Sequence, residues 1–191
     1  EKILYQSHPH IGTNKLPHII TSMRHAIEAH GGEVHFEKRV CEFVMEAGGK
    51  MEGVICADGT VFRANAVMLA TGHSARDIFQ LLHQKGIAIE AKPFALGVRA
   101  EHPQELIDAC QYHLPMNKPQ RDEHVPPASY SLVQQVGGRG VFSFCMCPGG
   151  IVVPAAAYEK TNIVNGMSFY SRGGAFANAA CVAGIHPDEL A

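Results

Sequence analysis

The sequence predicts an α/β chain, α+β overall, and three observations support this fold class. Apolar side chains repeat at helical spacing in several windows, short strand-like segments alternate with glycine turns, and one segment is apolar throughout. With 191 residues, the chain is long enough for one large domain or two small ones. The pattern of hydrophobic residues changes near Lys92-Pro93, so we expect residues 1–90 and 91–191 to form separate parts.

The first part is predicted to contain two helices, an antiparallel meander and one buried strand. Its first helix has apolar side chains on one face, with Pro17 in the first turn and a glycine pair after the last turn. The turn signals Gly48-Gly49 and Asp58-Gly59 separate the strands of the meander. The expected elements are a helix at 16–30, a strand at 33–40 running into 41–47, strands at 51–57, 60–64 and 66–71, and a helix at 75–85.

The second part is predicted to mix strands and helices around a long loop. Pro103 opens its first helix, proline recurs through the loop, and Gly137-Gly138-Arg139 joins two strands into a hairpin. A run of small residues near the end is interpreted as a helix. The expected elements are a strand at 94–102, a helix at 103–113, a loop at 114–127, strands at 129–136, 140–147 and 163–170, and a helix at 174–184.

The composition argues against several kinds of partner. Hydrophobic residues make up 46% and charged residues 18% of the sequence, which is the balance of an ordinary globular protein. A formal net charge of -2 without a Lys/Arg block argues against nucleic acid or an anionic membrane as a partner. No apolar run reaches the roughly 18 to 20 residues of a membrane helix, and the N-terminal residues lack the apolar core of a signal peptide. The 6 cysteines without a CxxC pair predict a reducing, cytoplasmic setting.

The stretch VMLATGHSARD, residues 67–77, contains the first candidate site. An apolar parallel strand that ends in small residues leaves backbone groups free at the carboxyl edge of a sheet, where open α/β sheets bind ligands. Ala70 and Gly72 allow a ligand close to the backbone, Thr71 adds a hydroxyl, and the following helix could point amides at an anion. Alternatively, Ala-Thr-Gly only ends a core strand before a turn, which is the commoner situation for this tripeptide alone.

The order of the elements resembles the central part of the glutathione-reductase-type flavoproteins, which have two dinucleotide-binding domains. Finer motifs resemble a narrower group, the bacterial FAD-dependent (NAD/FAD-utilizing) dehydrogenases, over essentially the whole chain. These motifs are PHIGTNKLP (9–17), LATGHSARDIF (69–79), KPFALGVRAEHPQELID (92–108), SFCMCPGG (143–150) and NGMS (165–168). The resemblance implies an FAD enzyme that exchanges electrons with a nicotinamide cofactor, NAD(P)H, or with another donor. It also implies that Val40 offers backbone groups to the FAD adenine, and that the Ala-Thr-Gly strand end and His73 lie beside the FAD.

The chain departs from the flavoprotein pattern at one point. Such proteins bind the FAD pyrophosphate through G-x-G-x-x-G, where backbone amides and a helix dipole neutralise the phosphates, and the sequence contains no such motif. The chain begins at Glu1 rather than Met, so we expect an internal fragment whose pyrophosphate half precedes Glu1 and which alone holds no FAD tightly. The resemblance makes residues 1–90 the middle of an FAD-binding, Rossmann-like domain and residues 91–191 an inserted substrate or cap domain.

The second candidate site is the run Cys145-Met146-Cys147-Pro148-Gly149-Gly150. On a regular strand Cys145 and Cys147 face the same side, so the two thiols could form a redox pair or half of a metal site. A zinc site needs about four ligands and no partner pair is evident, so we expect free thiols without metal, buried as small apolar residues. Paired glycines admit the backbone close to a ring system. With the resemblance, Pro148, Gly149 and Gly150 and the two cysteines become a candidate wall of the flavin or substrate pocket.

Histidine and arginine side chains supply the remaining candidates. His8, His10 and His73 could act as acid or base or hold the flavin by hydrogen bonds, or could simply face solvent or be satisfied in a core. Arg99 and Arg172 could hold an anionic substrate, because a guanidinium group matches a carboxylate, although most arginines are surface groups. The sequence assigns no catalytic base.

Together, these patterns predict a fragment of an FAD-dependent oxidoreductase that transfers hydride or electrons through flavin on a small-molecule substrate. Two alternatives stay open. One is a non-catalytic cap or interaction module without cofactor, and the other is a redox or metal module built on Cys145 and Cys147. A G-x-G-x-x-G upstream in the full-length gene would favour the flavoenzyme.

Overall fold

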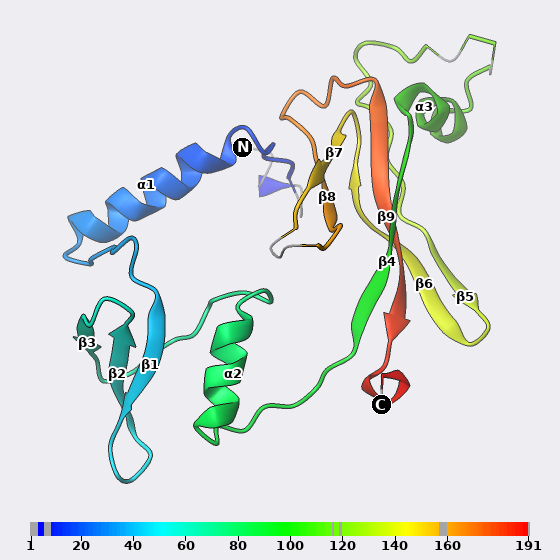
Figure 1. Ribbon diagram of the computed structural model, residues 1–191. Coiled ribbons are helices and arrows are strands. Elements are labelled where there is room, and N and C mark those ends of the chain that lie inside the picture. The colour runs from blue at the N-terminus through cyan, green and yellow to red at the C-terminus, as the bar shows by residue number, and fades with distance from the viewer. Residues whose placement is uncertain (1–3, 6–8, 116, 119, 157–159, 191) are drawn as a thin grey trace. The chain divides into compact units, whose positions relative to one another are not determined.

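The computed structural model describes residues 4–5, 9–115, 117–118, 120–156 and 160–190 (Figure 1). These residues form three α-helices, three antiparallel sheets and short 3-10 segments, so the predicted α+β class is confirmed. They contain no parallel sheet of the Rossmann type. Contacts divide the chain into a first unit, residues 24–91, and a second unit, residues 92–191 together with residues 1–23. Every helix in the described ranges is too short or too polar to serve as a membrane span.

The first unit is built on a three-stranded antiparallel meander, as predicted. Its strands, in the spatial order β1-β2-β3, are β1 (Val40–Met45), β2 (Met51–Cys56) and β3 (Val61–Arg63). The predicted second helix forms as α2 (Arg76–Gln84), which buries Ile78 and Leu81. Phe43 and Cys56 of the meander are also buried. These four side chains make up the small hydrophobic core of the first unit.

Two of the strands predicted for the first unit are absent, and those predictions are wrong. Residues 33–39 and 66–72 have no regular secondary structure, and Glu37 lies in the left-handed region with φ 57°. Met68 is 92% exposed. The segment 33–40 was predicted as the start of the meander's first strand, which begins only at Val40. The prediction at 66–71 assumed a strand of a parallel sheet, whose neighbours come from distant parts of the sequence. The described residues supply no such neighbour, whereas each hairpin of the meander brings its own partner.

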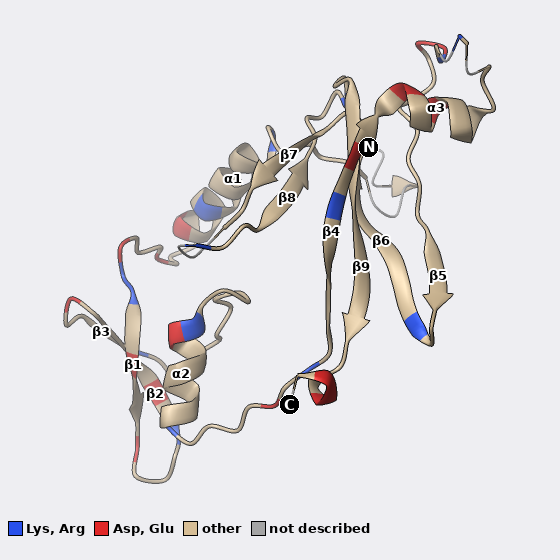
Figure 2. Ribbon diagram, turned by 45° about the vertical axis from the view of Figure 1, so that its right-hand side comes forward, with Lys and Arg blue, Asp and Glu red and all other residues tan. Residues whose placement is uncertain are grey.

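The second unit is organised by a four-stranded antiparallel sheet, here called the main sheet, with the order β4-β9-β6-β5 (Figure 1). Charged residues are sparse along its strands (Figure 2). The helix α3 (Gln104–Tyr112) follows directly on β4, and a separate hairpin, β7-β8, follows β6. The strands are β4 (Phe94–Pro103), β5 (Val133–Val136), β6 (Arg139–Cys147), β7 (Ile151–Pro154), β8 (Val164–Met167) and β9 (Phe176–Ile185).

The segment predicted as a helix at 174–184 is instead the strand β9, so that prediction is wrong. β9 pairs with β4 in continuous register from Phe176↔Pro103 to Ile185↔Phe94, and it pairs with β6 on its other side. Small side chains favour a helix in isolation, but this strand has neighbours on both edges, and tertiary pairing overrides the local preference. Ala177 and Ala179 are buried in this central position.

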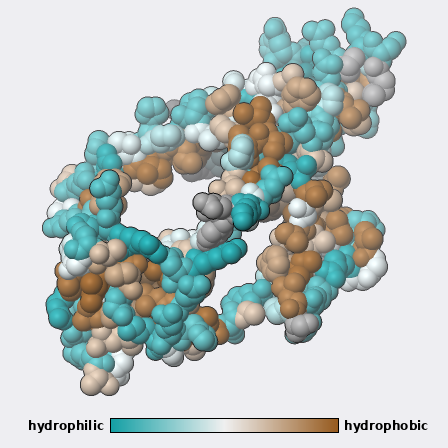
Figure 3. Space-filling view, viewed as in Figure 1, coloured by the Kyte–Doolittle hydropathy of each residue, from teal (hydrophilic) through white to brown (hydrophobic). Residues whose placement is uncertain are grey.

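The predicted first helix forms as α1 (Leu16–Ala29), and the boundary between the two units falls within it. No side chain of α1 is buried, and its apolar positions stay about half exposed, with Met23 at 57% and Ile20 at 56%. Hydrophobic residues reach the surface elsewhere too, as Figure 3 shows in brown. The amphipathic pattern therefore predicted the helix correctly, but the described residues do not cover its apolar face.

Candidate functional site

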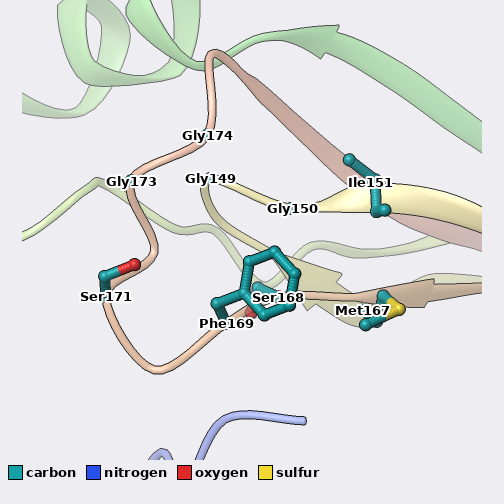
Figure 4. A pocket seen from close by; sticks show the side chains of 9 residues that line it. All are labelled: Gly149, Gly150, Ile151, Met167, Ser168, Phe169, Ser171, Gly173 and Gly174. Carbon is teal, nitrogen blue, oxygen red and sulfur yellow. The ribbon is translucent and has the colours of Figure 1, made fainter. Parts of the chain in front are cut away.

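A cavity of about 330 Å³ opens beside the turn that links β6 to β7 (Figure 4). Two glycine pairs and three large apolar side chains make up most of its wall, and two serines add hydroxyl groups. The lining residues are Gly149, Gly150, Ile151, Met167, Ser168, Phe169, Ser171, Gly173 and Gly174. The cavity thus combines bare backbone with an apolar surface, a combination that suits a flat organic ring.

Three of the four glycines, Gly149, Gly150 and Gly174, are needed because two chain segments cross closely at the cavity wall, whereas a Cβ at Gly173 would meet only Oγ of Ser171, at 3.7 Å. The Gly174 amide donates to the Gly149 carbonyl at 3.1 Å, and Gly149 has φ 55°. A Cβ at Gly150 would lie 2.5 Å from the Met167 carbonyl oxygen. Any side chain at these positions would force the segments apart, so the wall keeps its backbone exposed to the cavity.

A buried polar network holds this turn in place. The Gly149 amide donates to Oε1 of Gln104 at 2.8 Å, and Nε2 of Gln104 donates to Oδ1 of Asp108 at 2.8 Å and to the Ala128 carbonyl at 3.0 Å. Gln104 and Asp108 are 5% and 4% exposed. Nε of Arg121 lies 3.3 Å from Oδ2 of Asp108, so the two side chains form an ion pair. The network links α3 and the loop before β5 to the cavity wall, so it fixes the position of Gly149.

The N-terminal segment of the second unit packs behind the other side of the cavity. The Thr13 amide donates to the Ser168 carbonyl at 3.1 Å, and the Tyr170 amide donates to Oδ1 of Asn14 at 3.0 Å. His10 Nε2 donates to the Phe169 carbonyl at 2.9 Å. The motif PHIGTNKLP therefore lies against the segment that follows NGMS, and together these contacts position Ser168 and Phe169 in the cavity wall.

A polar cluster, composed of Arg99, Cys147, Arg172 and Asn178, adjoins the cavity. Nη1 of Arg99 donates to Oδ1 of Asn178 at 2.7 Å and to the Cys145 carbonyl at 3.1 Å. Gly166 packs directly on Arg99 and Asn178, where a Cβ would clash with both side chains. None of the four residues lines the cavity itself. Arg172 lies between the lining residues Ser171 and Gly173, and Gly150 packs on Cβ of Cys147, whereas Arg99 and Asn178 contact Gly166, which precedes the lining residue Met167.

Electrostatics in the polar cluster keep the Cys147 thiol protonated. Burial raises the pKa of Cys147, and this outweighs the opposing attraction of the Arg99 and Arg172 guanidinium groups. Burial also lowers the pKa of Arg172 from its ordinary value. A protonated thiol is a weak nucleophile. The cluster therefore offers hydrogen-bond donors and positive charge rather than a ready thiolate.

The cysteine pair does not have the geometry that the sequence pattern assumed. The register of β6 against β9 shifts between Phe144 and Cys147, and Cys145 has φ 47°, so the regular strand alternation is interrupted there. Cys145 is exposed and Cys147 is half-buried, and all the cysteines are unpaired. In the described ranges, no three His, Cys, Asp or Glu side chains gather closely enough to hold a metal. The absence of metal in solution stays a prediction.

The structure places the predicted site residues in two groups. Pro148, Gly149 and Gly150 are buried at the β6–β7 turn, and the two glycines line the cavity. Arg99, Cys145, Cys147 and Arg172 also belong to the second unit, near the cavity but not in its lining. The second group belongs to the first unit: Val40 begins β1, and Ala70, Thr71, Gly72 and His73 are exposed in the segment without regular structure. His73 Nδ1 lies 3.1 Å from Oγ of Ser74. His8 lies outside the described residues.

The sequence analysis missed Gly173, Gly174 and Asn178. Gly173-Gly174 is a second glycine pair after an arginine, and this signal could have been read beside Gly149-Gly150. Asn178 was hidden because its segment was interpreted as a helix of small residues. An asparagine among alanines in a central strand is the signal of a buried polar group that needs a partner.

An α+β domain with a glycine-walled apolar cavity next to a guanidinium cluster has the features of a ligand-binding domain. Residues 93–191 match the family model described as FAD-dependent protein, C-terminal domain-like, and the chain belongs to this family. An "Uncharacterized protein" of Clostridium beijerinckii (strain ATCC 51743 / NCIMB 8052) is 40% identical over 191 residues, or 99% of this chain. The chain spans 35% of the length of that relative.

Proposed function

We propose that the chain is part of an FAD-dependent oxidoreductase whose second unit provides a wall of the pocket where the substrate meets the flavin. Family membership supports the dependence on FAD. The observation that carries the proposal is the convergence, around one cavity, of segments 9–17, 143–150 and 165–168, which lie far apart in the sequence. The same three segments are among the motifs on which the resemblance to the FAD-dependent dehydrogenases is based.

The cavity fits one ring system rather than a whole dinucleotide. Its volume of about 330 Å³ is at the small end of ligand pockets, which span roughly 300 to 1,000 Å³. Its glycines admit a flat ring to the backbone, while Ile151, Met167 and Phe169 present apolar surface to it. The sequence has no glycine-rich pyrophosphate loop, so we place the phosphates of FAD on other residues of the longer protein.

The first unit contributes an incomplete sheet edge in this proposal. Residues 66–72 make no backbone hydrogen bond to other described residues, and the apolar side chains of Met68 and Leu69 are exposed. We propose that strands of the longer protein pair with this segment and complete a Rossmann-like parallel sheet. In that sheet, Val40 and residues 70–72 lie beside the FAD. Both faces of the segment are then covered, as its apolar composition predicts for a strand of a parallel sheet.

When bound, the flavin supplies hydride or electron transfer, and NAD(P)H is the donor that we propose to test first. The chain's own residues do the rest: the cavity offers an apolar wall that orients a small-molecule substrate, and the Arg172 guanidinium beside it supplies positive charge. We also propose a cytoplasmic location, without nucleic acid or a membrane as a partner, on the basis of the composition.

The experiment is a flavin measurement on the full-length protein and on the 191-residue chain, each released from its fold by heat. We expect about one FAD per full-length chain and none from the 191-residue chain, because the latter lacks a pyrophosphate loop. Full-length protein that is colourless and takes up no added FAD would overturn the flavoenzyme and leave a cofactor-free interaction module. Stoichiometric FAD on the 191-residue chain would overturn the assignment of the phosphates to other residues.

A further inference from the structure

Two arginines of the second unit, Arg99 and Arg172, lack an acidic partner within the part of the chain that the structure describes. Among the described residues, no carboxylate lies within ion-pair distance of Arg99 or Arg172, although both side chains are partly buried. Other arginines of the chain do have such partners: Arg24, Arg39, Arg63, Arg121 and Arg139 each lie within 4.0 Å of a carboxylate. A partly buried guanidinium without a counter-charge is costly, so its retention in both places calls for a partner.

Two buried donors in the same cluster also lack an acceptor. Asn178 is fully buried, at 0% exposure, and its Nδ2 has no hydrogen-bond partner among the described residues. Nε of Arg172 is buried and unpartnered in the same way. Buried donors in native proteins are nearly always satisfied, and each one left unpaired destabilises the fold. The cluster therefore has donors in excess and lacks an acceptor.

The missing acceptor belongs on one face of the main sheet. Asn178 pairs across the sheet with Glu101 and with Cys147, and Arg99 pairs with Ala180, two residues along β9 from Asn178. Alternation along the strands places Arg99 and Asn178 on the same face, which is the face that Gly166 of β8 covers. Both guanidinium groups interact electrostatically with Cys147. Donors from β4, β9 and the loop before β9 thus converge beside one protonated thiol.

We propose that this polar cluster binds the carboxylate of the substrate, whose apolar body occupies the adjoining glycine-walled cavity. A carboxylate is flat, carries one negative charge and has about four lone-pair sites, which matches two guanidinium forks and one amide. This assignment rests on the proposed function, because it names the substrate class for the same pocket. It makes the substrate an apolar or aromatic carboxylic acid.

The test uses a matched pair of probes on the 191-residue chain. Benzoate and benzamide share a ring and differ in charge, so their effects on the melting temperature separate carboxylate recognition from ring binding. We expect saturable stabilisation by benzoate, of roughly 3 to 6 °C at ten times its Kd, and none by benzamide at equal concentration. Equal effects of the two probes, or no effect of benzoate, would overturn the proposal. Stabilisation by inorganic pyrophosphate but not by benzoate would also overturn it and would assign the cluster to phosphate.

Variants of Arg99 test whether benzoate binds at the polar cluster. Arg99→Met removes one fork from an edge strand, and we expect it to weaken benzoate binding at least about tenfold. The control, Arg139→Met, changes an arginine of the same sheet that is paired with Glu189, and it should leave binding unchanged. Arg99→Lys keeps the charge without the fork and serves if the Met variant fails to fold; it too should bind benzoate more weakly. Unchanged binding in either Arg99 variant would contradict the proposal.

A further variant supplies the acceptor within the chain. Asn178→Asp places a carboxylate beside Arg99, so we expect a higher melting temperature without ligand and no further gain from benzoate. A lower melting temperature with benzoate binding retained would contradict this assignment. Failure here and failure of the proposed function are distinguishable: a colourless full-length protein with normal benzoate binding rejects only the flavin, and a yellow protein that ignores benzoate rejects only the carboxylate site.

Discussion

In the second unit, a strand of small residues is paired on both sides, whereas in the first unit an apolar segment of strand-like composition is paired on neither. β9 lies between β4 and β6 and buries Ala177 and Ala179. Residues 66–72 pair with no strand that the structure describes, and Met68 is 92% exposed. The antiparallel partners of β9 lie within the second unit, and in the proposed function the partners of residues 66–72 are parallel strands from other parts of the longer protein. The family match covers 93–191, the part that contains the main sheet.

The largest effect that we expect on either unit is the loss of Phe43, which tests whether the first unit has a core of its own. Phe43 is 5% exposed, and Phe43→Ala should lower the free energy of unfolding of that unit by about 3 to 5 kcal/mol. Phe36→Ala is the matched control, because Phe36 is 66% exposed and should change stability by less than about 0.5 kcal/mol. Urea unfolding measures both. Equal effects would mean that the first unit has no independent core.

The antiparallel elements could be predicted from the sequence because their signals are local. Gly48-Gly49 and Asp58-Gly59 mark the meander turns, and Gly137-Gly138 marks the β5–β6 hairpin, and all of these form. The strand β9 could not be predicted, because its small residues have a strand's conformation only between two partners. The site was predicted in part. Gly149-Gly150 stood out by composition, but the contact of Gly173-Gly174 with this pair depends on the path of the chain between β8 and β9, which no local sequence signal predicts.

The next largest effect concerns the second unit and its buried network. Gln104→Ala removes the acceptor of the Gly149 amide and a donor to Asp108, leaving both buried groups underpaired. We expect a loss of about 2 to 3 kcal/mol in the free energy of unfolding. Gln134→Ala is the control, because Gln134 is an exposed strand glutamine whose side chain donates to the carbonyl of the adjacent Gln135. If the two variants unfold at the same urea concentration, the network does not hold the cavity wall.

A smaller effect is expected in the reactivity of the thiols. Burial raises the pKa of Cys147, so at a pH between its ordinary and its raised value the folded protein keeps this group as a thiol, whereas the unfolded chain ionises it. Iodoacetamide should therefore modify Cys147 at least about tenfold more slowly in the folded than in the unfolded protein. Raising the pH should reduce the difference between the modification rates of Cys147 in the folded and the unfolded protein. Peptide mapping gives the rate at each site, with the exposed Cys145 as the internal comparison. Faster reaction of Cys147 in the folded state would instead indicate an activated thiolate.

The most direct test of the central claim is amide hydrogen exchange at residues 66–72, measured in the 191-residue chain and in the full-length protein loaded with FAD. The account predicts nearly unprotected amides in the 191-residue chain and exchange slowed at least about a thousandfold in the full-length protein, because strand pairing there protects the segment. Amides of β9 should be protected in both and serve as the reference. Residues 66–72 that exchange freely in both proteins would contradict the claim that this segment is a strand of a larger flavin-binding sheet.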